Sequence, residues 1–136
     1  MRYFLAKTDP ETYSIDQLEK EKRTSWDGVN NPQAVRAIRE MKPGDKVFIY
    51  HSGGLSAVVG LAKVASEPKD DPKNPKSVVA DFEYLGRIDP PVTLAEIKQS
   101  KLFDDWALVR QGRLSTMAAP EKFVEWMRKK NPKAKI

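Results

Sequence analysis

A polar turn near the start of the chain combines an aromatic ring, a carboxylate and two amides. The segment TSWDGVNN places Trp26 beside Asp27 and Gly28, and Asn30 and Asn31 follow at once. Tryptophan usually packs in a core, and asparagine is a common helix cap. In a polar turn, however, an indole ring can line a cleft, where a carboxylate accepts hydrogen bonds from the edge of a base. The segment therefore leaves open a structural turn and a binding surface.

Two later segments gather hydrogen-bonding side chains. YHS, residues 50–52, stands just before a Gly-Gly turn, and RQGRLS covers residues 110–115. An aromatic plane with amides, hydroxyls and guanidinium groups can hold one flipped base, by stacking on the ring and by hydrogen bonds to the base edge. Each segment also has a purely structural interpretation, as a polar strand end or as a solvated edge strand.

The sequence offers little for catalysis or for metal binding. His51 is the one histidine and cysteine is absent, which excludes thiolate nucleophiles, disulfides and zinc sites built from these residues. No glycine-rich phosphate loop occurs. Neighbouring strand residues point to opposite faces, so His51 and Ser52 do not converge on one substrate. We interpret His51 as a histidine that is hydrogen-bonded at a strand end, and we expect neither a metal nor a cofactor.

The length indicates one domain, and the basic charge is typical of a solvated tail but is also compatible with an anionic partner. The 136 residues carry 24 basic and 19 acidic side chains, a net charge of +5. The end MRKKNPKAKI is basic and has no acid, which attracts phosphate but is also typical of a solvated terminus. No stretch approaches the ~20 apolar residues of a membrane span, so no membrane partner is expected. We expect a cytoplasmic protein, or a nuclear one where the cell has a nucleus.

Strands and helices must position these groups. Alternating apolar residues predict strands over 2–8, 46–52, 55–67, 77–88 and, as an extended segment, 106–116. Helices are predicted after the caps Ser14, Asn31 and Thr93, and over 120–130. The segments 20–24 and 68–76 are expected to be exposed connections, with a break at DPPV, residues 89–92.

The order of these elements predicts the fold class. A tight hairpin lies in the centre and regular crossover helices are missing, which indicates an α+β fold with a mixed, mostly antiparallel sheet curled into a barrel. Gly60 inside its strand indicates a bulge or a close backbone approach. We expect one domain over residues 1–130 and a basic tail over 131–136.

The chain resembles the EVE domain family of PUA-like proteins in four blocks that occur in order: AKTDPETYSIDQL, TSWDGVNNPQAVRAIREMKPGDKVFIYHS, VVGLAKV and PVTLAEIKQSKLFDDWALVRQGRLS. The resemblance runs from Arg2 to about Trp126. It implies a single EVE domain with a PUA-like curled mixed β-barrel, mostly antiparallel, with surrounding helices. It also implies a non-catalytic module that flips a modified base of DNA or RNA into an aromatic-lined cleft, similar to the YTH readers of methylated adenine.

Carried over position by position, the resemblance implies a cleft built from Lys7, Thr8, Trp26, Asp27, Val29, Asn31, Tyr50, His51, Ser52, Arg110, Gln111, Arg113, Leu114 and Ser115. Trp26 would form a wall for the base. The chain departs from the family at Asn30 and Pro32, where arginine and an aromatic residue are more common, and at Gly112, where serine is common. At residues 7–10 this chain has KTDP, where the family often has KSEP. Losing a cation and an aromatic residue at the rim would weaken phosphate contact or change the preferred base.

Two alternative functions remain. ASCH domains, which are PUA-like relatives, look like hydrolases of acylated nucleosides that use a lysine, a threonine and a glutamate. Lys7, Thr8 and Glu11 match that set in part. The basic tail or the segment 68–76 can instead serve a protein-interaction module.

Overall fold

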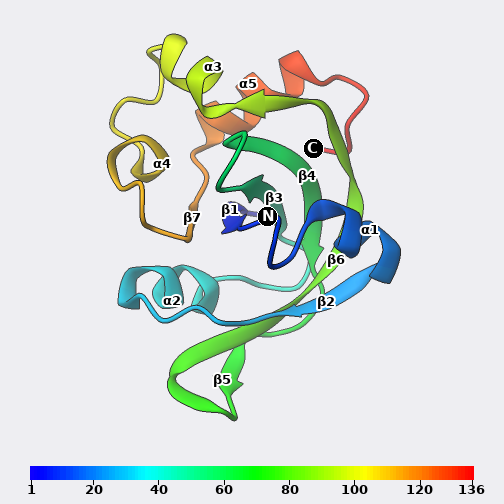
Figure 1. The fold of residues 1–136 in the computed structure, drawn as a ribbon, viewed down its shortest axis with the longest axis vertical. Coiled ribbons are helices and arrows are strands. Elements are labelled where there is room, and N and C mark those ends of the chain that lie inside the picture. Colours follow the sequence, from blue (N-terminus) through cyan, green and yellow to red (C-terminus); the bar gives the residue numbers. More distant parts are fainter.

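The apolar alternation of the sequence becomes a seven-stranded sheet in the computed structural model, which describes residues 1–136 (Figure 1). Its strands are β1 (Tyr3–Thr8), β2 (Arg23–Trp26), β3 (Lys46–His51), β4 (Ala57–Val64), β5 (Lys69–Asp71), β6 (Asn74–Thr93) and β7 (Thr116–Ala118). Its helices are α1 (Ile15–Glu21), α2 (Pro32–Arg39), α3 (Leu94–Gln99), α4 (Ala107–Arg110) and α5 (Glu121–Lys130). The structure confirms the α+β fold class.

The sheet is mostly antiparallel and strongly curled. Its strand order is β2-β6-β4-β3-β1-β7, and β5 pairs with β6 outside this path. Only β1 and β3 run parallel, with Lys7 opposite Tyr50 in the register. The long strand β6 bends around the molecule, from the β5 hairpin at one end to α3 at the other (Figure 1). The curl brings the edge strands β2 and β7 to the same side of the molecule, where α2 packs against β6 and β7.

Aromatic rings fill the interior between the sheet and the C-terminal helix. Phe4, Phe48, Phe82 and Phe123 are completely buried. Phe123 of α5 meets Phe48 of β3 edge to face at 5.3 Å between centroids. These contacts fix α5 against β3.

The helix caps and the central hairpin follow the sequence prediction. Ser14 and Gln17 form a reciprocal capping box at the start of α1. Thr93 caps α3 by accepting from the backbone N–H of Glu96. Both features predicted at Gly60 are confirmed, since an added Cβ would clash with Ile15 Cδ1 at the start of α1 and the register of β4 with β6 shifts between Val58 and Gly60.

Two segments that we expected to be connections form strands. Arg23–Trp26 pairs with β6 as an edge strand, and because only one of its faces is covered, its composition is polar. Residues 69–71 pair with β6 to form a hairpin. The three prolines and the charges of this region made it look like an unpaired loop, although exposed edge strands tolerate both.

Two further predictions differ from the structure. Residues 106–116 were expected to be extended, but Ala107–Arg110 form one helical turn. Trp106, directly before this turn, is held by a hydrogen bond from its indole N–H to Ala118 O at 2.9 Å. A short apolar run fits either period, so its spacing could not distinguish the two. The strand β6 continues through the break that was predicted at 89–92, but its pairing with β4 lapses there, because no residue between Arg87 and Val92 has a partner in the register.

The end of the chain folds back onto the sheet. Lys46 Nζ donates to Lys135 O at 2.6 Å, and Ile136 packs against the core. None of the helices combines the length and the apolar character that crossing a membrane requires.

Candidate functional site

A cavity of about 390 Å³ opens where β2 approaches the end of β1. We call it the cleft. Its lining comes from four segments, which are distant in sequence: the end of β1, the loop before α1, β2 with the turn that follows it, and the residue before β7. These residues are Lys7, Thr8, Thr12, Tyr13, Thr24, Ser25, Trp26, Asp27, Gly28, Val29 and Ser115. The curl of the sheet therefore creates the site, since β1 and β2 are not neighbours in the strand order.

Trp26 forms a wall of the cleft and also belongs to the core. It is the last residue of β2, rather than part of a free turn, and it is 7% exposed. Its ring stacks on Phe82 at 5.0 Å between centroids and meets Tyr13 edge to face at 6.1 Å. Its indole N–H has no hydrogen-bond partner in the protein, whereas that of Trp106 does. Trp26 thus offers the cleft an aromatic surface and an unused donor.

Lys7 brings a cation to the cleft. Its ammonium group donates to Gly112 O at 3.1 Å and lies 5.6 Å from the centre of the Tyr50 ring. No carboxylate lies within ion-pair distance of it. Burial lowers the pKa of Lys7, because desolvation disfavours its charged form. The remaining donor capacity of the ammonium group is available to an acceptor in the cleft.

Asp27 brings a carboxylate to the rim. The side chain is exposed and makes neither a hydrogen bond nor an ion pair, so it does not cap the turn. Gly28 follows with φ +76°, a left-handed conformation that favours glycine. Val29 is buried, and its backbone is held in place because its carbonyl accepts a hydrogen bond from Ser77 Oγ of β6. The cleft thus offers a free acceptor at Asp27 as well as free donors at Lys7 and Trp26.

Thr8 and Tyr13 join the two sides of the entrance. Thr8 Oγ1 donates to Tyr13 O at 2.8 Å, and the Tyr13 hydroxyl donates to Glu21 at 2.7 Å. Burial, together with this carboxylate, raises the pKa of Tyr13. Sequence reasoning missed Tyr13, as it missed Thr12, Thr24, Ser25 and Gly28. The available signal was an aromatic residue directly before the α1 cap, in the same block as Lys7 and Thr8.

Two of the predicted site residues have structural roles beside the cleft. Asn31 caps α2, with Oδ1 accepting from the N–H groups of Gln33 and Ala34 at 2.9 and 3.2 Å. Tyr50 is 3% exposed and lies beneath Lys7, and burial raises its pKa. Neither residue lines the cleft.

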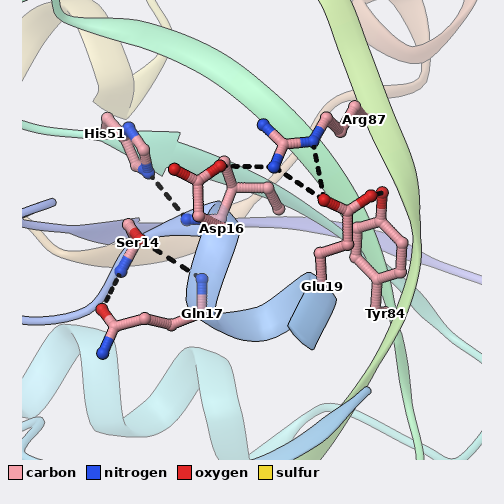
Figure 2. A network of polar contacts seen from close by, with 8 residues as sticks. Ser14, Asp16, Gln17, Glu19, His51, Tyr84 and Arg87 are labelled. Atoms are coloured by element: carbon pink, nitrogen blue, oxygen red, sulfur yellow. Dashed lines mark hydrogen bonds and ion pairs between the residues drawn. The ribbon is translucent and has the colours of Figure 1, made fainter. Parts of the chain in front are cut away.

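His51 lies in a separate place, on the other side of the loop before α1. Its Nε2 accepts from the backbone N–H of Ile15 at 3.0 Å, which confirms the expected hydrogen-bonded histidine at a strand end. Figure 2 shows this bond beside the ion pairs of Arg87 with Asp16 and Glu19. His51 and Arg87 line a second cavity of about 470 Å³. Ser52 lines neither cavity, and its N–H donates to Thr8 O at 2.9 Å.

The RQGRLS block contributes mainly its backbone. Ser115 lines the cleft and its carbonyl accepts from the N–H of Lys7 at 2.7 Å, while Leu114 is buried in the core. Arg110 pairs with Asp105 at 3.2 Å, away from the cleft. Gln111 and Arg113 are exposed outside the cleft lining. Gly112 places the carbonyl that holds Lys7.

This arrangement suits one planar heterocycle. The volume falls within the ~300–1,000 Å³ that is typical of small-molecule sites. An aromatic wall, an apolar side chain at Val29 and fixed donors and acceptors can hold a ring by its faces and its edge. The chain contains no group of three His, Cys, Asp or Glu residues that could hold a metal ion.

Comparison with known proteins agrees with this geometry. The EVE domain family model matches residues 2–130. Human thymocyte nuclear protein 1 is 31% identical over 124 residues, which cover 71% of this chain and 55% of that protein. The chain spans about half the length of the curated relatives it matches.

Solved structures show the same fold. A hypothetical protein from Leishmania major is 33% identical, with a TM-score of 0.88 and coverage of 97% of this chain and 95% of that one. The human THYN1 protein in complex with DNA containing 5-methylcytosine is 24% identical, with a TM-score of 0.87 and coverage of 98% and 99%. The Mmi1 YTH domain, 18% identical with a TM-score of 0.58, shares the fold more distantly over 96% of this chain and 88% of that one. These likenesses confirm the PUA-like fold.

Proposed function

The chain belongs to the EVE domain family, and we propose that it is a non-catalytic module that binds one flipped, modified base of a nucleic acid in the cleft at Trp26. A 5-methylcytosine-type base in DNA is the ligand that we put first. The human THYN1 protein was solved with DNA that contains this base, and that support is independent of the geometry of the cleft.

One observation carries the proposal: the unpaired Trp26 indole N–H, the remaining donor capacity of the Lys7 ammonium group and the unpaired Asp27 carboxylate line the same aromatic cavity. A cytosine-type ring donates from its exocyclic amine and accepts at its ring nitrogen and carbonyl oxygen. Asp27 is suited to the amine, while Lys7 and the Trp26 indole N–H are suited to the acceptors. In free protein these three groups have no partner among protein side chains, so a base would satisfy them without breaking an existing side-chain bond.

The energies are of the right size for a selective but reversible reader. Extracting a base costs a few kcal/mol of stacking and pairing. Contact with an aromatic side chain returns about 1–3 kcal/mol, and the hydrogen bonds supply the rest. A methyl group on the base would lie against apolar surface such as Val29. Burying one carbon unit contributes about 0.8 kcal/mol, which corresponds to roughly fourfold selectivity.

The hydrolase alternative has less geometric support. Lys7 and Thr8 both line the cleft, because it opens at the end of β1, but Glu11 does not. Thr8 Oγ1 already donates to Tyr13 O, so it is not poised beside a base for nucleophilic attack. The three residues needed for that chemistry do not surround one cavity.

Tryptophan fluorescence tests the proposal. The protein would be titrated with duplexes that contain one 5-methylcytosine, one cytosine or one thymine at the same position, and with the matching RNA strands. Wild type would be compared with Trp26→Phe, which leaves Trp106 and Trp126 as unchanged reporters. We expect saturable quenching that is strongest for the methylated duplex and is lost in the variant. Equal responses to all duplexes, or none, would refute base reading.

A further inference from the structure

The β5–β6 hairpin projects from the body of the molecule at the end that carries β2 and α2 (Figure 1). Its strands pair from Lys69 opposite Val79 to Asp71 opposite Asn74. The cleft described above does not include any residue of this hairpin. Its charges therefore have no role in the proposed base pocket.

The hairpin is nevertheless tied to the rim of the cleft. Trp26 pairs with Ala80, and the chain beyond Trp26 continues beside the hairpin stem. Ser77 Oγ donates to Val29 O at 2.5 Å in a buried bond, and Asn74 Nδ2 donates to Asn30 Oδ1 at 2.8 Å. The segment that forms the rim and the hairpin thus hold each other in place.

Two of the three exposed lysines of the hairpin lie beside Asn74, which contacts the rim, and the third, Lys69, lies on β5. Lys73 and Lys76 flank Asn74, and neither forms an ion pair. The neighbouring acids are engaged: Asp70 pairs with Arg39 at 2.8 Å, and Asp71 Oδ1 accepts from the N–H of Lys73 at 2.9 Å. The N–H of Lys76 donates to Asn74 Oδ1 at 3.0 Å, which fixes the backbone beside the rim. Two exposed cations are therefore presented next to the rim, from a backbone that is fixed by hydrogen bonds.

We propose that Lys73 and Lys76 bind backbone phosphates of the strand that supplies the flipped base. This inference rests on the proposed function. When a base enters the cleft, its flanking phosphates stay at the rim, whereas Lys7 lies in the cleft lining and its ammonium group donates to Gly112 O. On the other side of the cleft, the exposed Arg113 adjoins Gly112 and has no ion pair either. The backbone would cross the mouth of the cleft between Arg113 and the hairpin lysines.

Salt-dependent binding of two duplexes tests the proposed phosphate contacts of Lys73 and Lys76, which we call the arm. The probes are a duplex with one 5-methylcytosine and the same duplex with cytosine, titrated between 50 and 200 mM salt. Lys73→Gln/Lys76→Gln would be compared with the control Lys98→Gln/Lys129→Gln, which removes the same charge from exposed positions on α3 and α5. Each phosphate contact adds about 0.9 to the slope of log affinity against log salt. We expect the slope of the hairpin variant to be about 2 smaller in magnitude than that of wild type. Between 50 and 200 mM salt, the affinity of the variant should therefore fall by a factor that is about tenfold smaller than for wild type.

The outcomes separate the arm from the base pocket. A reduced slope with unchanged preference for the methylated duplex supports both proposals. An unchanged slope in a variant that still prefers the methylated duplex overturns the arm and leaves the base reader standing. A reduced slope with no preference for either duplex supports the arm and overturns modified-base reading.

Discussion

The rings of Trp26 and Phe82 stack with 25° between their planes, so one residue is both a wall of the cleft and a part of the core. Trp26→Ala should therefore remove core packing together with base binding. Truncating a buried tryptophan costs about 3–5 kcal/mol of unfolding free energy, and we expect a loss in this range by urea denaturation. Trp26→Phe keeps a ring against Phe82 and should cost less. If Trp26→Ala unfolded at the same urea concentration as wild type, the contact between Trp26 and Phe82 would contribute little to stability.

Lys7 should be more important for binding than for stability. Replacing it by Met removes the cation and its bond to Gly112 O but keeps a flexible apolar chain beside Tyr50. Because burial lowers the pKa of Lys7, the folded state disfavours its charge at neutral pH. We expect Lys7→Met to unfold at the same or a higher urea concentration, while its affinity for a methylated duplex falls about tenfold. Lys129→Met is the matched control, and a marked loss of stability would contradict the account.

Asp27 should determine which base edge is accepted. Its carboxylate has no partner in the protein, so Asp27→Asn should change the unfolding free energy by less than about 0.5 kcal/mol. A hydrogen bond to a charged group is about twice as strong as a neutral one, and we expect roughly tenfold weaker binding of the methylated duplex. The measurement is fluorescence titration beside Asp104→Asn, an exposed aspartate outside the cleft lining. Equal affinities of the two variants would exclude Asp27 from base contact.

The parts of the fold that depend on short-range patterns could be predicted from the sequence. The Ser14–Gln17 capping box and the Asn31 cap require only neighbouring residues. The β3–β4 hairpin and the close approach at Gly60 are likewise visible in the alternation of apolar residues. The family resemblance then placed Lys7, Trp26 and Ser115 together, although they are far apart in sequence.

The rest depends on long-range packing that local patterns do not encode. Arg23–Trp26 is polar because it forms an edge strand, and only the pairing with β6 makes it a strand. Tyr13 reaches the cleft because its ring packs against Trp26, a contact between a loop and an edge strand that the sequence did not predict. The RQGRLS block enters the site through the backbone of Gly112 and Ser115, and side-chain types say nothing about that.

Asn31 provides a test that separates a cap from a ligand contact. Its side-chain oxygen already accepts from the N–H groups of Gln33 and Ala34. Asn31→Ala should cost about 1 kcal/mol of unfolding free energy, whereas Asn31→Ser should retain most of the cap. Under conditions where both variants are folded, we expect them to bind a methylated duplex equally well. Weak binding by the well-capped Asn31→Ser would instead place this amide in contact with the nucleic acid.

His51 should make stability depend on pH. Burial lowers its pKa, and Arg87 acts in the same direction, whereas Asp16 and Asp9 oppose the shift. The neutral ring accepts from the N–H of Ile15, and protonation removes that acceptor. Because the pKa is lower in the folded state, the contribution of His51 is fully present above the unfolded value near 6.5 and is lost as the pH falls through the folded value.

The measurement is urea unfolding of wild type and His51→Gln at pH 7.5 and at pH 5.0. Glutamine can still accept from Ile15 but does not titrate, so it isolates the protonation step from the loss of a hydrogen bond. We expect wild type to lose more stability than the variant on acidification, and proton NMR of the single histidine to report a pKa below 6.5. Since α1 directly follows Tyr13, binding of a methylated duplex should weaken over the same pH range in wild type only. Parallel pH profiles of the two proteins would show that the bond between His51 and Ile15 does not link acidification to the cleft.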